Sequence, residues 1–132
     1  MALPPSGSNC ETLAQCHSEC SSANQASCVR ESNMYRDGYS VAASKAKAAA
    51  ILKRSCDKYK HPRSCFEYGW MLREGWMFEV ERNSEKFEEY GISRTRQYTA
   101  AKCTKSKKKK AGDVDACLVR AELEIRLLNR DT

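Results

Sequence analysis

The residues with the most evident chemistry in this sequence are its eight cysteines, at positions 10, 16, 20, 28, 56, 65, 103 and 117 of 132. A thiol can form a disulfide, ligate a metal or act as a redox nucleophile. Zinc sites favour two close Cys-x2–4-Cys pairs, and only Cys16 and Cys20 have such a spacing here. Because a chain of this length buries only a thin core, structural disulfides are the predicted use of these residues.

Other side chains that serve in catalysis are sparse. The two histidines are His17 and His61, and His61 lies beside a turn proline, where a surface position is expected. The sequence has no nucleophile elbow, no Gly-rich phosphate-binding loop and no Cys-x-x-Cys-His haem motif. We therefore expect a protein that is not an enzyme and that holds neither a metal nor a cofactor.

A repeat organises the cysteines. Residues 27–38 align without gaps on residues 64–75. Cys28 and Cys65, 37 residues apart, are therefore at equivalent positions of the repeat. The cysteines that precede them, Cys20 and Cys56, are 36 residues apart. A period of about 30 to 40 residues with helical patterning is typical of an α-solenoid. The predicted fold class is therefore all-α, a short α-solenoid of about three disulfide-stapled helical hairpins.

The second unit shows the expected hairpin most clearly. Residues 40–56 combine a capping serine, Ser40, with an alanine-rich body and cations near the end, which predicts one long helix. Pro62 suits the first turn of a second helix that ends at Gly75. Cys56 then ends one helix and Cys65 begins the next, so a disulfide across the turn would staple the hairpin.

A third, altered unit follows. Residues 93–106 predict a first helix that carries Cys103, and Asp113 is the expected cap of a second helix that carries Cys117. This last helix continues through Leu128 and is expected to cap the array. The predicted organisation is an N-terminal extension (1–9) and one repeat domain (10–129). That domain comprises units at about 10–38, 40–75 and 93–129, with an insertion at 76–92.

These residues carry a resemblance to a known family. Lys53-Arg54-Ser55-Cys56 and the run from Ser64-Cys65-Phe66-Glu67-Tyr68-Gly69 to Arg73-Glu74-Gly75 resemble the disulfide-stapled branch of the Sel-one-like repeat family, related to tetratricopeptide repeats. The resemblance covers roughly residues 16 to 127. It implies a protein-binding scaffold without catalytic residues. The implied disulfides join Cys20 to Cys28, Cys56 to Cys65 and Cys103 to Cys117. Cys10 and Cys16 either pair with each other or leave one thiol free.

The expected compartment is oxidising. No run of 18 apolar residues occurs, so no membrane-spanning helix is expected, and residues 1–9 show neither a secretory signal nor a mitochondrial presequence pattern. This combination favours the mitochondrial intermembrane space, peripheral to the inner membrane, and similarity to the mitochondrial members of the branch over the secreted bacterial ones. The expected function is that of an accessory subunit or assembly factor of a respiratory complex, cytochrome c oxidase first. The alternatives are a secreted or periplasmic cysteine-rich repeat protein with an extracellular partner, and a small mitochondrial ribosome protein.

Two groups of residues are candidates for contact with other subunits of a large complex. Phe66, Tyr68 and Trp70 spread around one helix, so some of them contact either the inserted segment or a partner. Trp70, Trp76 and Phe78 are the predicted interface anchors. Within the lysine run, Lys107, Lys108, Lys109 and Lys110 are expected either to be solvated or to contact anionic lipid headgroups or an acidic protein. Nucleic acid is not favoured, because no aromatic residues interleave with the lysines and the net charge is only +6.

Overall fold

Helices make up all the regular structure in the residues that the computed structural model describes, 10–22, 24–74, 83–104 and 111–130. The predicted all-α fold of paired helices is confirmed. The helices, in chain order, are α1 (Leu13–Ser22), α2 (Gln25–Asp37), α3 (Lys45–Tyr59), α4 (Pro62–Glu74), α5 (Ser84–Phe87), the π-helical segment η2 (Glu88–Arg94), α6 (Thr95–Thr104) and α7 (Ala111–Arg130).

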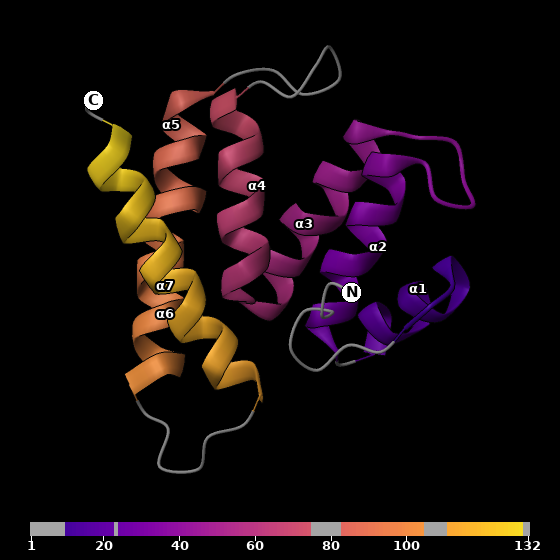
Figure 1. Ribbon diagram of the computed structural model, residues 1–132, viewed down its shortest axis with the longest axis horizontal. Helices are drawn as coiled ribbons and strands as arrows, with labels where there is room; N and C mark the ends of the chain where they lie inside the picture. The colour runs from indigo at the N-terminus through magenta and orange to yellow at the C-terminus, as the bar shows by residue number, and fades with distance from the viewer. Residues whose placement is uncertain (1–9, 23, 75–82, 105–110, 131–132) are drawn as a thin grey trace.

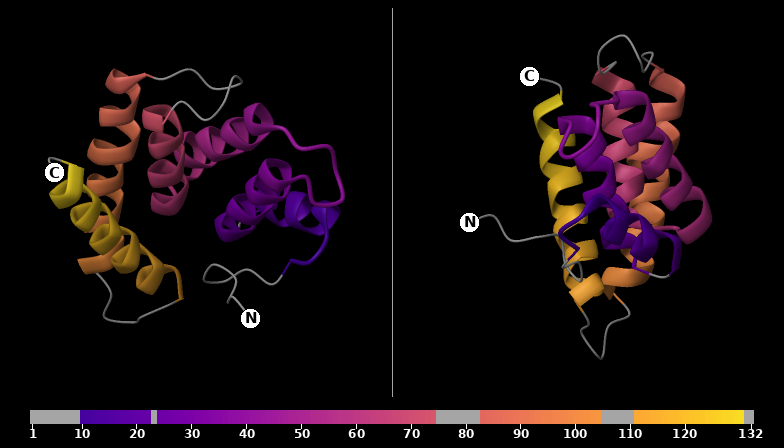
Figure 2. Two further views of the ribbon diagram at one scale, coloured as in Figure 1. Left: turned by 45° about the horizontal axis from the view of Figure 1, so that its top comes forward. Right: turned by 90° about the vertical axis from the view of Figure 1, so that its right-hand side faces the viewer.

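The helices form a row of hairpins. α1 packs on α2, α3 on α4 and α6 on α7, and α2 also packs on α3 so that the first two hairpins adjoin. α4 lies in the middle of the molecule and packs against α3, α5, η2, α6 and α7 (Figure 1). The row is curved, with α1 and α7 at its opposite ends (Figure 2).

The start of α3 corrects one expectation. The capping serine is Ser44, whose Oγ accepts a hydrogen bond from the backbone N–H of Lys47 at 3.1 Å. Ser40, the predicted cap, lies in the connection from α2, where its φ of 61° is left-handed, whereas a capping residue has an extended backbone. Gly38 ends α2 in the left-handed conformation, with its N–H donating to the carbonyl of Met34.

The second half of the chain departs further from the expected pattern. α5, η2 and α6 follow one another without a break, so residues 84–104 form one helical rod that includes the end of the predicted insertion. This rod begins at Asn83, whose Oδ1 accepts from the N–H of Lys86, rather than at residue 93. α7 begins at Ala111, so the prediction that Asp113 caps it is wrong. The predicted helix end at Gly75 lies outside the described residues.

A close crossing of two glycines explains why the rod lies against α4. A Cβ atom built on Gly69 of α4 would lie 2.2 Å from the Cα atom of Gly91 in η2, so the two backbones are in direct contact. The rings beside the crossing interlock: Tyr68 meets Tyr90 edge to face, with ring centroids 4.8 Å apart. The crossing and its rings are part of one buried cluster that runs from Val29 of α2 to Leu123 of α7.

An ion-pair network joins α4 to α7. Arg63 donates to Asp115 at 2.9 Å and to Glu122 at 3.1 Å, and the side chains of Arg63 and Asp115 are largely buried. Burial of the guanidinium opposes its charge, but the hydrogen bond that Arg63 donates to Asp115, together with the charges of Asp115, Glu67 and Glu122, outweighs this and raises the pKa of Arg63. The network therefore joins the second and third hairpins through a largely buried ion pair.

Candidate functional site

Every cysteine of the chain lies among the described residues and takes part in a disulfide. Three bridges are those implied by the family resemblance: Cys20–Cys28 between α1 and α2, Cys56–Cys65 between α3 and α4, and Cys103–Cys117 between α6 and α7. The fourth joins Cys10 to Cys16, which settles the alternative that the sequence left open. Cys10 precedes α1, and Cys16 lies within it.

The central staple shows how local sequence places a bridge. α3 ends when Lys60 adopts the left-handed conformation, with φ of 53°, and its N–H donates to the carbonyl of Cys56. Pro62 then begins α4 at its first residue, as predicted. This tight turn brings the Cα atoms of Cys56 and Cys65 to 4.8 Å, inside the range that a disulfide requires.

A chain of hydrogen bonds runs beside this bridge. Ser64 donates to the hydroxyl of Ser55 at 2.8 Å, and the Nδ1 atom of His61 lies 2.8 Å from the Oγ of Ser64. Burial, together with the nearby ammonium of Lys102, lowers the pKa of His61 to about 4. His61 is therefore neutral near pH 7, and its partly buried ring closes the turn.

The other histidine, His17, also makes a contact within a hairpin, in this case the first. The Nδ1 atom of His17 on α1 lies 2.7 Å from the Oε2 of Glu31 on α2, and Glu31 is buried. The neighbouring Ser27 donates to Glu19 at 2.6 Å across the same helix pair. Both histidines thus make contacts that hold a hairpin together.

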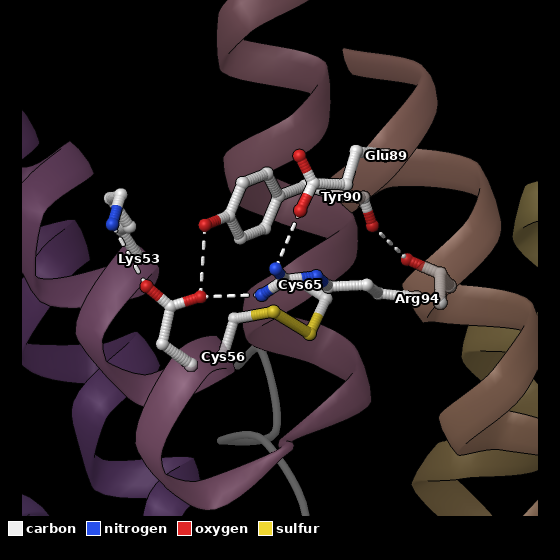
Figure 3. Close-up of polar contacts among 8 residues, drawn as sticks. Lys53, Cys56, Cys65, Glu89, Tyr90 and Arg94 are labelled. Carbon is white, nitrogen blue, oxygen red and sulfur yellow. Dashed lines mark hydrogen bonds and ion pairs between the residues drawn. A yellow bond between two sulfur atoms is a disulfide. The ribbon is translucent and has the colours of Figure 1, made fainter. Parts of the chain in front are cut away.

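Next to the central disulfide, side chains from α3 and from the rod converge on one carboxylate. Lys53 of α3 and Tyr90 and Arg94 of η2 point toward the same place (Figure 3). There Asp57 accepts from Lys53 Nζ at 2.8 Å, from the Tyr90 hydroxyl at 2.9 Å and from the Arg94 guanidinium. Glu89 pairs with the other side of Arg94. We call this group the Asp57 cluster.

The Asp57 cluster is electrostatically satisfied. Burial of the carboxyl disfavours its charge, but the hydrogen bonds from Lys53, Tyr90 and Arg94 together hold the pKa of Asp57 below its usual value. Tyr90 shows the reverse effect, because burial and its hydrogen bond to Asp57 raise the pKa of its hydroxyl. The cluster is thus a tie between α3 and the rod, with each charge engaged by an opposite one.

The outer side of α3, beside this cluster, is basic. A shallow depression of about 430 Å³ is lined by Ala50, Lys53, Arg54, Asp57 and Lys58. Lys53 is paired with Asp57, whereas no described carboxylate pairs with Arg54 or Lys58. We call Arg54 and Lys58 the basic face of α3. It has the charge to receive an acidic side chain, and nothing in the sequence pattern singled it out from the lysine run further on.

The structure places only part of the predicted anchor set. Trp70 is buried, 7% exposed, and its ring meets that of Phe87 edge to face with centroids 4.8 Å apart. Phe66 and Tyr68 are buried as well. Trp70 therefore packs on the inserted segment, one of the two contacts expected for the aromatic residues of this helix, and its role as an interface anchor stays a prediction. Trp76, Phe78 and the lysines 107–110 lie outside the described residues.

Sequence reasoning missed the crossing partner of Trp70 and Tyr68. A signal was present, because the string Glu-Tyr-Gly occurs twice, at 67–69 and at 89–91. These two strings are the segments that cross at Gly69 and Gly91. In this chain the crossing therefore coincides with a string that the sequence repeats.

Within the described residues, no three or more His, Cys, Asp or Glu side chains are grouped so as to hold a metal ion. Among the same residues, no helix has the length and apolar character needed to cross a membrane. Comparisons of the chain with protein-family models, with curated proteins and with solved structures find no match.

Proposed function

We propose that this chain is a non-catalytic scaffold that binds other proteins and is built on the Sel-one-like helical repeat. The observation that carries the proposal is the recurrence of one construction in three successive hairpins. In each, a disulfide joins the end of one helix to the start of the next, at Cys20–Cys28, Cys56–Cys65 and Cys103–Cys117. Stacked hairpins of this kind present extended surfaces to partners.

The proposed setting is the intermembrane space of the mitochondrion, in a respiratory complex, with cytochrome c oxidase as the first choice. Four disulfides in a chain of 132 residues support an oxidising compartment, because cytosolic thiols are kept reduced. The basic face of α3 supports a protein partner with acidic residues at its contact. The basic face of α3 is thus a second candidate for such a contact, in addition to the lysine run.

Purification of the tagged protein from its source under non-reducing conditions tests this proposal. Mass spectrometry of the native preparation identifies the proteins that accompany it, and respiratory-complex subunits are the expected companions. Ribosomal proteins, or recovery from the secreted fraction, would contradict the respiratory assignment and favour one of the two alternatives. Recovery of the chain without stoichiometric companions would contradict the scaffold itself.

A double charge-reversal variant and a control variant test whether partners bind the basic face of α3. Arg54→Glu combined with Lys58→Glu is expected to reduce the recovered companions at least several-fold, because like charges would then face each other across the contact. Lys86→Glu is the matched control, since Lys86 is an exposed lysine on α5. Equal recovery with the double variant and with the control would exclude the basic face of α3 as the binding surface.

A further inference from the structure

α7 has two apolar faces, although it packs on the rest of the molecule with only one. Ala116, Val119 and Leu123 are buried against the core. On the opposite side are four exposed large apolar residues and one exposed alanine: Val114 (46% exposed), Leu118 (57%), Ala121, Ile125 (58%) and Leu128 (76%). We call these five residues the outer stripe.

The outer stripe is the reverse of what a terminal helix needs. A helix at the end of a repeat array has a polar outer face, which keeps the array soluble, and a surface helix is generally apolar on one side only. The expectation that the last helix caps the array is therefore not met. α7 lies at the end of the row of hairpins, so its outer side faces away from α4 (Figure 2).

The outer stripe is nearly symmetric along the helix. Its members follow one another at spacings of four, three, four and three residues, so all of them lie on one side of an α-helix. Ala121, the smallest, is at the centre, with Leu118 and Ile125 on either side and Val114 and Leu128 each seven residues away. A second α7 laid antiparallel would therefore place Leu118 against Ile125 and Val114 against Leu128.

The charges beside the outer stripe suit the same arrangement. On one flank Arg120 pairs with Glu124 at 3.2 Å, and Glu124 also accepts from Arg96 at 2.9 Å. On the other flank Arg126 pairs with Glu122 at 3.0 Å. Each flank thus carries both signs. Antiparallel pairing about Ala121 brings Glu124 of one copy beside Arg120 of the other on the first flank. On the second flank it brings the two copies of Glu122 near the axis, where each is already paired with Arg126 and Arg63. A partner of a single charge sign would instead meet like charge on both flanks.

We propose that the outer stripe binds a second copy of this chain, so that two α7 helices pack antiparallel about a twofold axis through Ala121. A twofold contact uses the same surface on both copies and closes after two chains. The small side chain at the centre permits the close helix approach that ridges-into-grooves packing requires. This self-association goes beyond the proposed scaffold function and does not depend on which proteins accompany the chain.

Cysteine cross-linking of the oxidised full-length chain tests both the contact and its register. Ala121→Cys is expected to form a covalent dimer under mild oxidation, because the two substituted positions meet at the axis. Leu128→Cys is the matched control. Its two copies would be about 21 Å apart along the helices, so it does not cross-link alone, but it does cross-link when mixed with Val114→Cys. Peptide mapping must show that the four native disulfides stay in place.

Analytical ultracentrifugation over a concentration series gives the affinity. Leu118→Glu is expected to raise the dimer dissociation constant at least about tenfold, because it buries a charge twice in one contact. Tyr39→Glu is the control, since Tyr39 is an exposed aromatic residue (59%) outside the outer stripe. A chain that remains monomeric at several hundred micromolar and gives no 121–121 cross-link overturns the proposal. Self-cross-linking of Leu128→Cys overturns it too, because it indicates parallel pairing.

Discussion

At the scale of single residues, Asp57 ties α3 to the rod through three side chains. Asp57→Asn removes the charge that Lys53 and Arg94 share, and we expect it to lower the free energy of unfolding by about 1–2 kcal/mol. Chemical denaturation followed by circular dichroism measures this. Asp37→Asn is the matched control, because Asp37 is 61% exposed beside Arg36 and its loss should cost less than about 0.5 kcal/mol. Equal losses for the two variants would contradict the structural role of the Asp57 cluster.

His61 gives the protein a predictable response to acid. Its pKa is about 4 in the folded chain and 6.5 as a free side chain, so the unfolded chain binds the additional proton between these values. The contribution of His61 to the free energy of unfolding is therefore fully present above about pH 6.5. It is lost as the pH drops toward 4, by up to about 3 kcal/mol. Denaturation midpoints at several pH values measure the slope. In His61→Gln the slope between pH 6.5 and 4 should flatten, and an unchanged slope would show that another group is responsible.

At the scale of the elements, the crossing of α4 and η2 depends on two missing side chains. Gly69→Ala places a methyl group 2.2 Å from the Cα of Gly91, so the backbones must separate, and we expect a loss of about 3 kcal/mol or more. Gly91→Ala meets the ring of Phe87 at 3.1 Å and the Cα of Gly69 at 3.2 Å, both much longer than 2.2 Å, so its cost is smaller. Thermal unfolding ranks the two variants, and a milder effect of Gly69→Ala would contradict the described crossing.

The hairpin staple is the second element-scale feature that can be measured. Replacement of Cys56 and Cys65 together by serine opens a loop of about ten residues, and loop entropy predicts a loss of roughly 2.5 kcal/mol. Amide exchange should accelerate in α3 and α4, because the bridge joins them at their turn. Loss of stability without faster exchange in these helices would show that the staple acts elsewhere.

The hairpins were predictable from the sequence because their signals are local. Pro62 and the paired cysteines lie within a few residues of the turns that they determine, and the 37-residue repeat shows that the same hairpin recurs. The start of α3 was misplaced because Ser40 and Ser44 are the same residue type, and only the folded backbone shows that Ser44 reaches the N–H of Lys47 while Ser40 has a positive φ. The crossing of Gly69 and Gly91 joins segments 22 residues apart in different helices, so periodicity within a helix does not reveal it.

The candidate surfaces were less predictable than the fold. Spacing around α4 showed that its aromatic residues face different directions, but the packing partner of Trp70 became evident only when the rod was placed against it. Apolar residues on two sides of α7 follow from its sequence, yet which side is buried depends on how α7 packs on α4. Surface function therefore depends on tertiary placement, whereas the stapled hairpin depends on local chemistry.

At the scale of the whole molecule, stability rests on the disulfides. Four bridges over loops of this size contribute about 10 kcal/mol together, which is comparable to the total stability of a typical domain. We therefore expect the reduced and alkylated chain to lose its cooperative unfolding transition at 25 °C. Far-ultraviolet circular dichroism during thermal denaturation measures this. A sharp transition in the reduced chain would show that the helical core suffices without its bridges.

The order of the bridges along the chain has a kinetic consequence. The cysteines pair in consecutive couples along the chain: 10 with 16, 20 with 28, 56 with 65 and 103 with 117. Eight cysteines can pair in about 105 ways. In this pattern every cysteine pairs with a neighbouring cysteine of the sequence. A chain that enters an oxidising space with its N-terminus first can complete each bridge as soon as its second thiol arrives. Oxidation can thus keep pace with entry, without later reshuffling by an isomerase.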